Sequence, residues 1–261
     1  MKIGFVQLTS KLDFEANLTK LRHFLALAKN QGLKYIFLPE CFYSMSDGTT
    51  ATPHLVSFEN EHFKNIQSLA KDYSVYLLGG SVAFSEAGRV LNRCLNFSPD
   101  GELLGFYDKI HLFSCDLQAG ASKKIINESD IYTCGKLPQM IQVGPLKVGL
   151  SICFDLRYPE MFRNYVLNGA NILSISAAFT VPTGKAHWHT LLRARAIENQ
   201  CFVVAPAQYG RHNERVQTFG HSLIIDPWGD ILVDAGEGEK LLWHDIDLDK
   251  ITQVRSAVKV F

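Results

Sequence analysis

Three side chains that could do chemistry together each follow a strand-like stretch of the chain. Cys153 comes directly after the apolar run 148–152, Glu40 follows the run 35–38 and a proline, and Lys109 ends a strand-like segment. The ends of strands are where α/β proteins place reactive groups, because the junction is exposed while the sheet behind it stays rigid. We therefore examine these three residues as one candidate site.

The three residues complement one another chemically. A thiol with an ordinary pKa of roughly 8.5 is mostly protonated at neutral pH, so its attack on an amide needs a base and a nearby cation. Glu40 supplies a carboxylate base and Lys109 supplies an ammonium for Cys153. Taken singly, each has a plainer interpretation: a solvated glutamate, a lysine whose stem covers apolar surface, and an inert buried thiol.

The elements that must position these residues follow an α/β pattern. Apolar residues repeat at helical spacing within 14–28, with Asp13 as the N-cap and Gly32 at the end, and a second such stripe runs over 63–73. Strands are predicted over 3–8, 35–38 and 75–81, and this alternation implies parallel pairing with helical crossovers. Residues 114–139 show little periodicity and are expected to form a long surface excursion.

The second half of the chain repeats this scheme. Strands are expected within 141–153 and over 172–176, and helices over 159–168 and 185–199. Matching turns, Ser98-Pro-Asp-Gly101 and Asp226-Pro-Trp-Gly229, occupy equivalent places in the two halves. We expect two similar α/β halves whose sheets pack face to face with helices outside.

Composition excludes several classes of protein. The chain has 261 residues, 47% of them hydrophobic, and 26 basic residues balance 26 acidic ones, so neither a nucleic acid nor an anionic membrane is an expected partner. The first apolar run is too short for a signal peptide, and no run is long enough to cross a bilayer. The six cysteines form no close pairs, which fits a reducing cytoplasm and a small-molecule substrate.

Other hydrolase and nucleotide-binding patterns are missing from the sequence. His187 and His189 lie two apart on a predicted helix and so face different sides, and no His-Glu-x-x-His pattern occurs, so no metal ligand set is predicted. There is also no Gly-x-Ser-x-Gly elbow, P-loop or dinucleotide fingerprint.

The motifs around the three residues resemble those of the nitrilase (carbon-nitrogen hydrolase) superfamily. Leu-Pro-Glu40, Asp-Lys109-Ile-His-Leu and Cys153-Phe-Asp-Leu-Arg-Tyr-Pro-Glu stand in that family's order, followed by Ala186-His-Trp188 and Asp226-Pro-Trp-Gly229. The resemblance implies one domain over residues 1–261, a four-layer α-β-β-α sandwich, a homodimer, thiol chemistry and no cofactor. It also implies a second acid beside the triad, which Glu128 matches.

Loop sequences narrow the resemblance further. The stretches Ser176-Ala-Ala-Phe179 and Ala207-Gln-Tyr-Gly-Arg-His-Asn-Glu214 are most similar to the branch that hydrolyses deaminated glutathione. That branch implies hydrolysis of the side-chain amide of a small α-keto acid through a thioester. Two alternatives stay open: ω-amidase activity on α-ketoglutaramate or α-ketosuccinamate, and a catalytically idle binding member of the same fold.

Four positions are predicted to contact the substrate. The backbone N–H of Phe154 is expected to hold the oxyanion together with Lys109. Arg157 lies about one helical turn after the thiol, where its planar guanidinium suits an α-keto carboxylate. Thr183 and Arg211 are expected at the same carboxylate and at the far, glycyl end of the substrate, respectively.

Each of these contacts has a structural alternative. Arg157 is equally expected to form an ion pair with Glu160 or Glu198, and Thr183 to cap the helix that follows it. Arg211 and its neighbour His212 are, taken singly, more typical of solvated loop residues.

Overall fold

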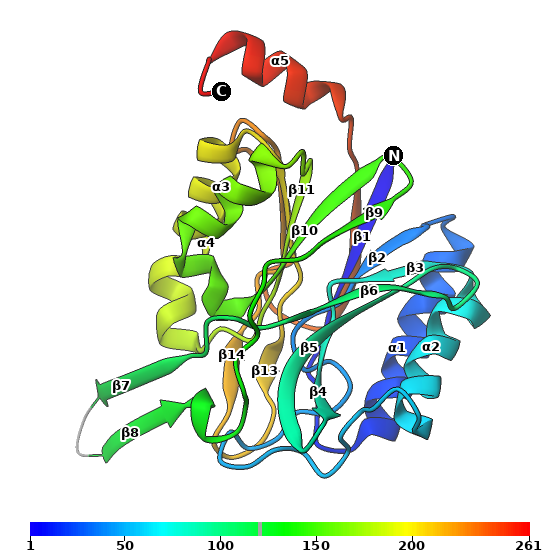
Figure 1. Cartoon of the computed structure of the whole chain (residues 1–261), viewed down its shortest axis with the longest axis vertical. Coiled ribbons are helices and arrows are strands. Elements are labelled where there is room, and N and C mark those ends of the chain that lie inside the picture. The colour runs from blue at the N-terminus through cyan, green and yellow to red at the C-terminus, as the bar shows by residue number, and fades with distance from the viewer. Residues whose placement is uncertain (120–121) are drawn as a thin grey trace.

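The chain folds into two sheets that are packed face to face and covered by helices on both outer sides. The computed structural model describes the backbone of residues 1–119 and 122–261, and the side chains outside 115–126. In Figure 1, α1 (Phe14–Asn30) and α2 (Glu61–Tyr73) cover one outer side, and α3 (Pro159–Leu167) and α4 (Val181–Asn199) the other. The expected four-layer α-β-β-α arrangement is confirmed.

The first sheet has the order β17-β1-β2-β3-β5-β4, with β6 paired to β5. Strands β1, β2 and β3 run parallel, as the alternation of strands and helices predicted. The bounds of the strands in this sheet are β1 Lys2–Gln7, β2 Tyr35–Phe37, β3 Tyr76–Leu78, β4 Ser81–Glu86, β5 Arg89–Phe97, β6 Leu103–Asp108 and β17 Lys240–Asp245.

The second sheet has the order β16-β15-β12-β11-β10-β9. Its three central strands are parallel neighbours, since β10 pairs with β11 and β11 pairs with β12. The bounds of the strands in this sheet are β9 Met140–Val143, β10 Leu146–Ile152, β11 Ile172–Ser176, β12 Phe202–Ala205, β15 Leu223–Ile225 and β16 Ile231–Asp234.

Alternation along the strands builds the layers. Phe5 and Phe37 point toward the second sheet and join its core, whereas Val6 and Ile36 pack under α1 and α2. Side chains of consecutive strand residues point to opposite faces, so a single strand serves both layers. Asp13 caps α1 as predicted, accepting hydrogen bonds from the backbone N–H of the second and third helical residues.

Helix α4 begins at Val181, four residues earlier than the predicted start at Lys185. The sequence Pro182-Thr-Gly184 is typical of a loop, but the proline occupies the first turn, where its missing N–H costs no hydrogen bond. Gly184 is inside the helix because a Cβ there would lie 2.3 Å from Cβ of Phe219. The glycine thus permits close packing, and it does not end a helix.

Residues 114–139 contain regular structure that the weak periodicity did not predict. Strands β7 (Ser114–Ala119) and β8 (Ser122–Asn127) pair as an antiparallel hairpin, which projects from the body in Figure 1. A short 3-10 turn, Glu128–Asp130, follows the hairpin and returns the chain to the sheets. The predicted surface excursion is present, and within the backbone that the structure describes here it contains a regular hairpin that the sequence did not indicate.

Three further elements were not predicted from the sequence. Strands β13 (Tyr209–Arg211) and β14 (Gln217–Phe219) form a small hairpin beside the first turn of α4. Helix α5 (Asp249–Ala257) ends the chain beyond β17. In the part of the chain that the structure describes, none of the helices combines the length and apolarity needed to cross a bilayer.

Candidate active site

Cys153, Glu40 and Glu128 open onto one cavity of about 620 Å³ at the carboxyl ends of parallel strands. Cys153 directly follows β10, and Glu40 lies three residues after β2. The two residues belong to different sheets, and only the face-to-face packing of the halves brings them to one cavity. Lys109 lies behind them and is 1% exposed.

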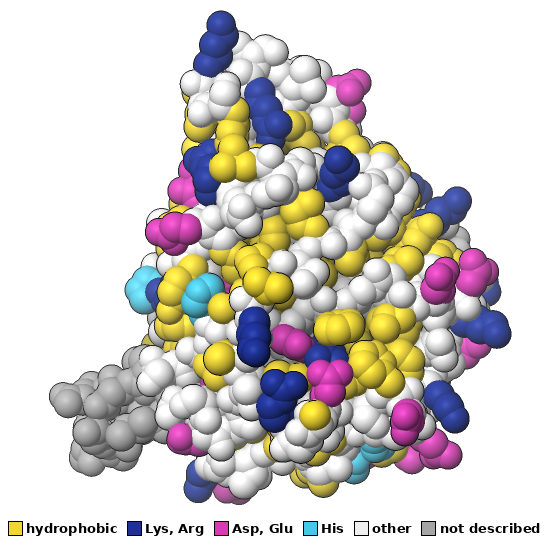
Figure 2. Space-filling model, viewed as in Figure 1, with side chains coloured by type: hydrophobic (Ala, Val, Ile, Leu, Met, Phe, Trp, Pro, Cys, Tyr) yellow, Lys and Arg dark blue, Asp and Glu magenta, His cyan; other side chains and the backbone are white. Residues whose placement is uncertain are grey.

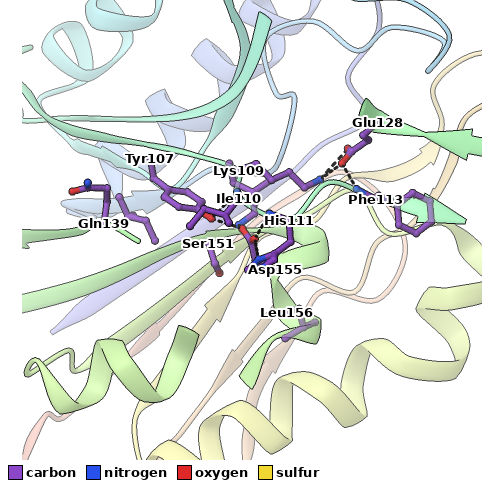
Figure 3. A network of polar contacts seen from close by, with 12 residues as sticks. Tyr107, Lys109, Ile110, His111, Phe113, Glu128, Gln139, Ser151, Asp155 and Leu156 are labelled. Carbon is purple, nitrogen blue, oxygen red and sulfur yellow. Dashed lines mark hydrogen bonds and ion pairs between the residues drawn. The ribbon is translucent and has the colours of Figure 1, made fainter. Parts of the chain in front are cut away.

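Lys109 bridges the two acids. Its Nζ lies 2.9 Å from Oε1 of Glu40 and 2.9 Å from Oε1 of Glu128. The other oxygen of Glu128 accepts the backbone N–H of Phe113 at 2.7 Å, which orients this carboxylate (Figure 3). Burial lowers the pKa of Lys109, but Glu128 and Glu40 together outweigh it and hold that pKa well above its ordinary value. The lysine is therefore a fixed cation.

The Glu40 carboxylate is held through one of its two oxygens. Its Oε1 accepts hydrogen bonds from Nδ2 of Asn92 at 2.8 Å and from Lys109, and Gln208 donates to its backbone carbonyl at 2.9 Å. Among the described residues, no hydrogen bond falls on Oε2. The carboxylate is thus anchored through one oxygen, and no described residue hydrogen-bonds to the other.

The thiol of Cys153 is neutral at rest. Burial and the negative charge of Glu40 raise its pKa well above the ordinary value, although Lys109 and a hydrogen bond from the backbone of Ala178 act in the opposite direction. A neutral thiol needs a base at the moment of attack, and the carboxylates of Glu40 and Glu128 both line the cavity.

The backbone at Cys153 is held in an unusual conformation by a buried carboxylate. Cys153 has φ of +50°, in the left-handed region that costs a non-glycine residue energy. Asp155, 0% exposed, accepts the backbone N–H of Ile152 at 2.8 Å and the phenol of Tyr107 at 2.8 Å. Asp155 also accepts both the ring Nδ1 and the backbone N–H of His111, at 2.7 and 3.1 Å (Figure 3).

This network joins the segments that carry Lys109 and Cys153. Asp155 and His111 belong to the two quoted motifs and Tyr107 directly precedes one of them, but the sequence assigned them no role. The signal that could have identified these residues is Asp155, the acid two residues after the cysteine. A carboxylate that is buried requires hydrogen-bond donors around it. Asn92 and Gln208 had no such signal, because each becomes part of the site only when the sheets come together.

The predicted substrate contacts separate into two groups. Phe154, Arg157 and Thr183 line the cavity, whereas Arg211 does not. Arg211 is exposed on β13, and its Nε donates to the backbone carbonyl of Asn213 at 3.2 Å. The cation that the hairpin brings to the cavity is Arg215, which was not predicted from the sequence.

Arg157 and Thr183 do not make the structural contacts that were the alternatives to substrate binding. Among the side chains that the structure describes, Arg157 has no carboxylate partner: Glu198 pairs with Arg195 instead, at 2.9 Å. The Arg157 guanidinium lies 5.7 Å from the Phe154 ring centroid and contacts Nδ1 of His187 at 3.2 Å. Thr183 does not cap α4 and shares a hydrogen bond of 2.8 Å with the Thr180 hydroxyl.

His212 is a structural residue in this fold. Its two ring nitrogens lie 2.7 Å from the Ser10 carbonyl and 2.7 Å from Oγ1 of Thr218, and its side chain is buried. Burial lowers its pKa to about 4, so the ring is neutral and joins the hairpin to the first half of the chain.

The Cys153 thiol and the Glu40 carboxylate line one cavity, the Lys109 ammonium lies behind them, and these groups suit a thiol-dependent hydrolase on an α-β-β-α sandwich. Residues 2–256 match the family model described as carbon-nitrogen hydrolase, and the chain belongs to that family. The family resemblance seen in the motifs is thus confirmed, and the protein is an enzyme that hydrolyses carbon–nitrogen bonds.

Relatives with curated names have similar lengths. A deaminated glutathione amidase of Synechocystis is 38% identical over 96% of this chain and 93% of its own length. Omega-amidase NIT2 of Homo sapiens is 34% identical over 100% of this chain and 93% of its own. The crystal structure of Saccharomyces cerevisiae Nit3, a member of branch 10 of the nitrilase superfamily, superposes with a TM-score of 0.88 at 30% identity, covering 99% of this chain and 95% of that one.

Proposed function

We propose that this enzyme is a cysteine-dependent amidase that hydrolyses the side-chain amide of a small α-keto acid, with deaminated glutathione as the preferred substrate. The observation that carries the proposal is the arrangement at the cavity. Cys153 faces it beside Glu40, whose carboxylate is anchored through Oε1 alone among the described residues, and Lys109 is fixed between two acids.

The reaction that we propose begins with the thiol proton. Glu40 accepts it as Sγ of Cys153 attacks the amide carbonyl, and the oxyanion is held by Nζ of Lys109 and the backbone N–H of Phe154. Glu40 then returns the proton to the leaving amine, which departs and leaves a thioester on the cysteine. Water, deprotonated by Glu40, hydrolyses the thioester to the acid and the free thiol.

Glu128 is proposed as a positioning residue in this scheme. It shares Lys109 with Glu40, and one of its oxygens is held by the backbone of Phe113. Burial raises the pKa of Glu128, and Lys109 opposes that shift. The acid thereby keeps the ammonium pointed at the position of the developing oxyanion.

The two candidate substrates share a keto acid and differ at the other end. Deaminated glutathione and α-ketoglutaramate both present an α-keto carboxylate, which we assign to Arg157 and Thr183. Only deaminated glutathione carries a dipeptide with a terminal carboxylate beyond the amide. The cavity continues to Arg215, Thr49 and Gln217, so it has both room and a cation for that end.

The experiment that tests the proposed function compares these two substrates. We expect a higher kcat/KM for deaminated glutathione than for α-ketoglutaramate, measured by release of the α-keto diacid that both reactions form. A higher value for α-ketoglutaramate would favour ω-amidase activity, and no release from either substrate would favour the idle binding member.

Substitution of the arginines tests the assigned contacts. Arg215→Ala is expected to raise KM for deaminated glutathione about ten- to hundred-fold and to leave α-ketoglutaramate unaffected, because a charge-assisted hydrogen bond contributes roughly 1.5–3 kcal/mol. Arg211→Ala is the matched control and is expected to change neither KM. Arg157→Lys, in contrast, should raise KM for both substrates. Equal effects of the Arg215 and Arg211 variants would contradict the assignment.

We also propose that the protein acts as a single domain over residues 1–261 and forms a homodimer in the cytoplasm. Leu167 on α3 and Ile197 on α4 are 67% and 47% exposed on the outer helical layer, which supports a partner there. The five cysteines whose side chains the structure describes carry free thiols, which suits a reducing compartment. Basic and acidic side chains intermingle over the face in Figure 2 and create no single-sign field.

The proposed dimer makes a measurable prediction. Replacing Leu167 and Ile197 with glutamate should place charges in the interface and convert the dimer to a monomer in sedimentation-velocity runs. The control is Leu12→Glu, at an apolar residue that is 47% exposed on the opposite half of the chain. A wild-type protein that sediments as a monomer at micromolar concentration would refute the interface.

A further inference from the structure

Three ligand-type side chains meet outside the cavity, at the end of the molecule where α4 approaches β16. His189 lies on α4, His221 lies between β14 and β15, and Asp234 is the last residue of β16. Their ligand atoms all lie within 4.8 Å of one another, and none of the three lines the catalytic cavity. Because these residues are far apart in the sequence, no spacing motif could reveal the cluster.

One oxygen of Asp234 faces both imidazoles. Its Oδ2 lies 3.0 Å from Nε2 of His189 and 3.2 Å from Nδ1 of His221. The other oxygen, Oδ1, accepts the backbone N–H of Gly236 at 2.8 Å and also lies 2.9 Å from Nδ1 of His221. In a tetrahedral zinc site with bonds of about 2.0–2.1 Å, neighbouring ligand atoms are about 3.3 Å apart. The two measured separations are close to that value.

The position of His221 is fixed by contacts that do not involve its ring nitrogens. Its backbone N–H donates to the Gly236 carbonyl at 3.0 Å, and its own carbonyl accepts Nε1 of Trp188 at 2.7 Å. Its φ of +54° is in the left-handed region, and its ring stacks on Phe219 with centroids 4.4 Å apart. A non-glycine residue held in this way often serves a ligand.

The cluster is accessible to an ion from solvent. The side chains of His189, His221 and Asp234 are 33%, 26% and 34% exposed, so water can reach the open coordination positions. Each imidazole has one nitrogen toward Asp234 and the other free of any hydrogen bond among the described residues. The arrangement therefore differs from a closed structural site and matches three protein ligands plus water.

We propose that these residues bind one divalent transition-metal ion of the Zn²⁺ class. The ligands are Nε2 of His189, Nδ1 of His221 and Oδ2 of Asp234, with water completing the coordination. Two imidazoles and a carboxylate suit zinc, nickel or cobalt, whereas calcium and magnesium prefer oxygen ligands alone. Any proton on the two coordinating nitrogens leaves to solvent as the metal–nitrogen bonds form.

The bound ion would act as a structural link. The ligand atoms lie within 4.8 Å of one another, and ligands on one ion are at most about 4.2 Å apart, so a small adjustment of one side chain is enough to close the site. His189, on the half-exposed face of α4, has the rotamer freedom for this movement. The ion would then tie α4 to the edge of the second sheet. The first turn of α4 lines the cavity, but the ion itself takes no part in the hydrolysis.

The test is a metal titration of the full-length protein after removal of any tag and treatment with chelator. Cys134 is replaced by serine in every sample, because it is an exposed thiol that would compete for the metal. We expect one equivalent of Zn²⁺ in isothermal titration, and a Co²⁺ absorption spectrum without the charge-transfer band of thiolate ligands. Binding should also raise the melting temperature, since the ion binds the folded state.

Variants of the cluster residues test whether these side chains are the metal ligands. His189→Ala and Asp234→Asn are each expected to weaken this binding about ten-fold or more, and to keep the amidase activity of the metal-free protein. His23→Ala, at an exposed histidine on α1, is the matched control and should bind like the parent protein. His189→Gln provides a second variant in case the alanine variant does not fold. An absent equivalent of Zn²⁺, or unchanged affinity in both cluster variants, would overturn the proposal and leave the cluster as a hydrogen-bonded contact.

Discussion

Replacing Cys153 with alanine is expected to lower kcat on the order of 10⁴-fold or more, because the proposed mechanism forms the acyl intermediate on this thiol. The melting temperature should change little, since alanine fits the space of the thiol and keeps the backbone of the cysteine loop. The measurement is release of the α-keto diacid from deaminated glutathione at saturating concentration. Binding of the substrate should persist and is followed by calorimetry with the variant.

The control for this prediction is Cys134, whose thiol is exposed. Cys134→Ala should retain full turnover, and iodoacetamide should inactivate it at the same rate as the wild type. If Cys153→Ala instead kept near wild-type turnover, the proposed nucleophile would be wrong even though the family assignment stands. Loss of activity together with loss of folding would point to a packing role, which is why the melting temperature is measured in parallel.

The layers of the fold could be predicted because they follow from local patterns. The stripe on α1 and the cap at Asp13 are written in consecutive residues, and strand alternation implies the crossovers. The early start of α4 could not be predicted, since Gly184 is present for contact with Phe219, 35 positions along the chain. A residue that permits close packing and one that breaks a helix look alike in sequence.

In the candidate site, too, residues within local sequence patterns could be predicted, and residues that depend on distant contacts could not. Glu40, Lys109 and Cys153 each end a strand-like segment and could be singled out by chemistry. Asn92 and Gln208, which orient the Glu40 carboxylate and backbone, come from strands and loops that meet it only in the folded chain.

Arg215 shows a further limit of prediction from the sequence. Arg211 and Arg215 are on the same hairpin four residues apart, and the prediction from sequence chose Arg211 for the far end of the substrate. The turn between β13 and β14 determines which arginine lines the cavity, because it directs Arg215 there and leaves Arg211 in solvent. Hairpin geometry of this kind depends on register, which is set by contacts with the rest of the fold.

Replacing Lys109 with methionine is expected to reduce both stability and turnover. The variant leaves Glu40 and Glu128 buried without their shared cation, and breaking such a buried pair costs about 3–5 kcal/mol in the free energy of unfolding. The loss should shrink as the pH is lowered. Burial already raises the pKa of Glu128, and removing the lysine removes the charge that opposes this shift, so the folded state binds a proton there more readily than the unfolded chain and gains stability as the proton binds. Urea denaturation at several pH values measures this effect.

A second substitution separates the two roles of the lysine. In Lys109→Met with Glu128→Gln, one of the two carboxylates that lost their cation is removed, so part of the stability should return. Turnover should stay low, because neither methionine nor glutamine supplies the cation that the oxyanion needs beside the Phe154 N–H. If the double variant recovered both stability and turnover, Lys109 would serve only to neutralise buried acids. If the single variant unfolded like the wild type at every pH, the buried ion triad would not contribute to stability as its contacts imply.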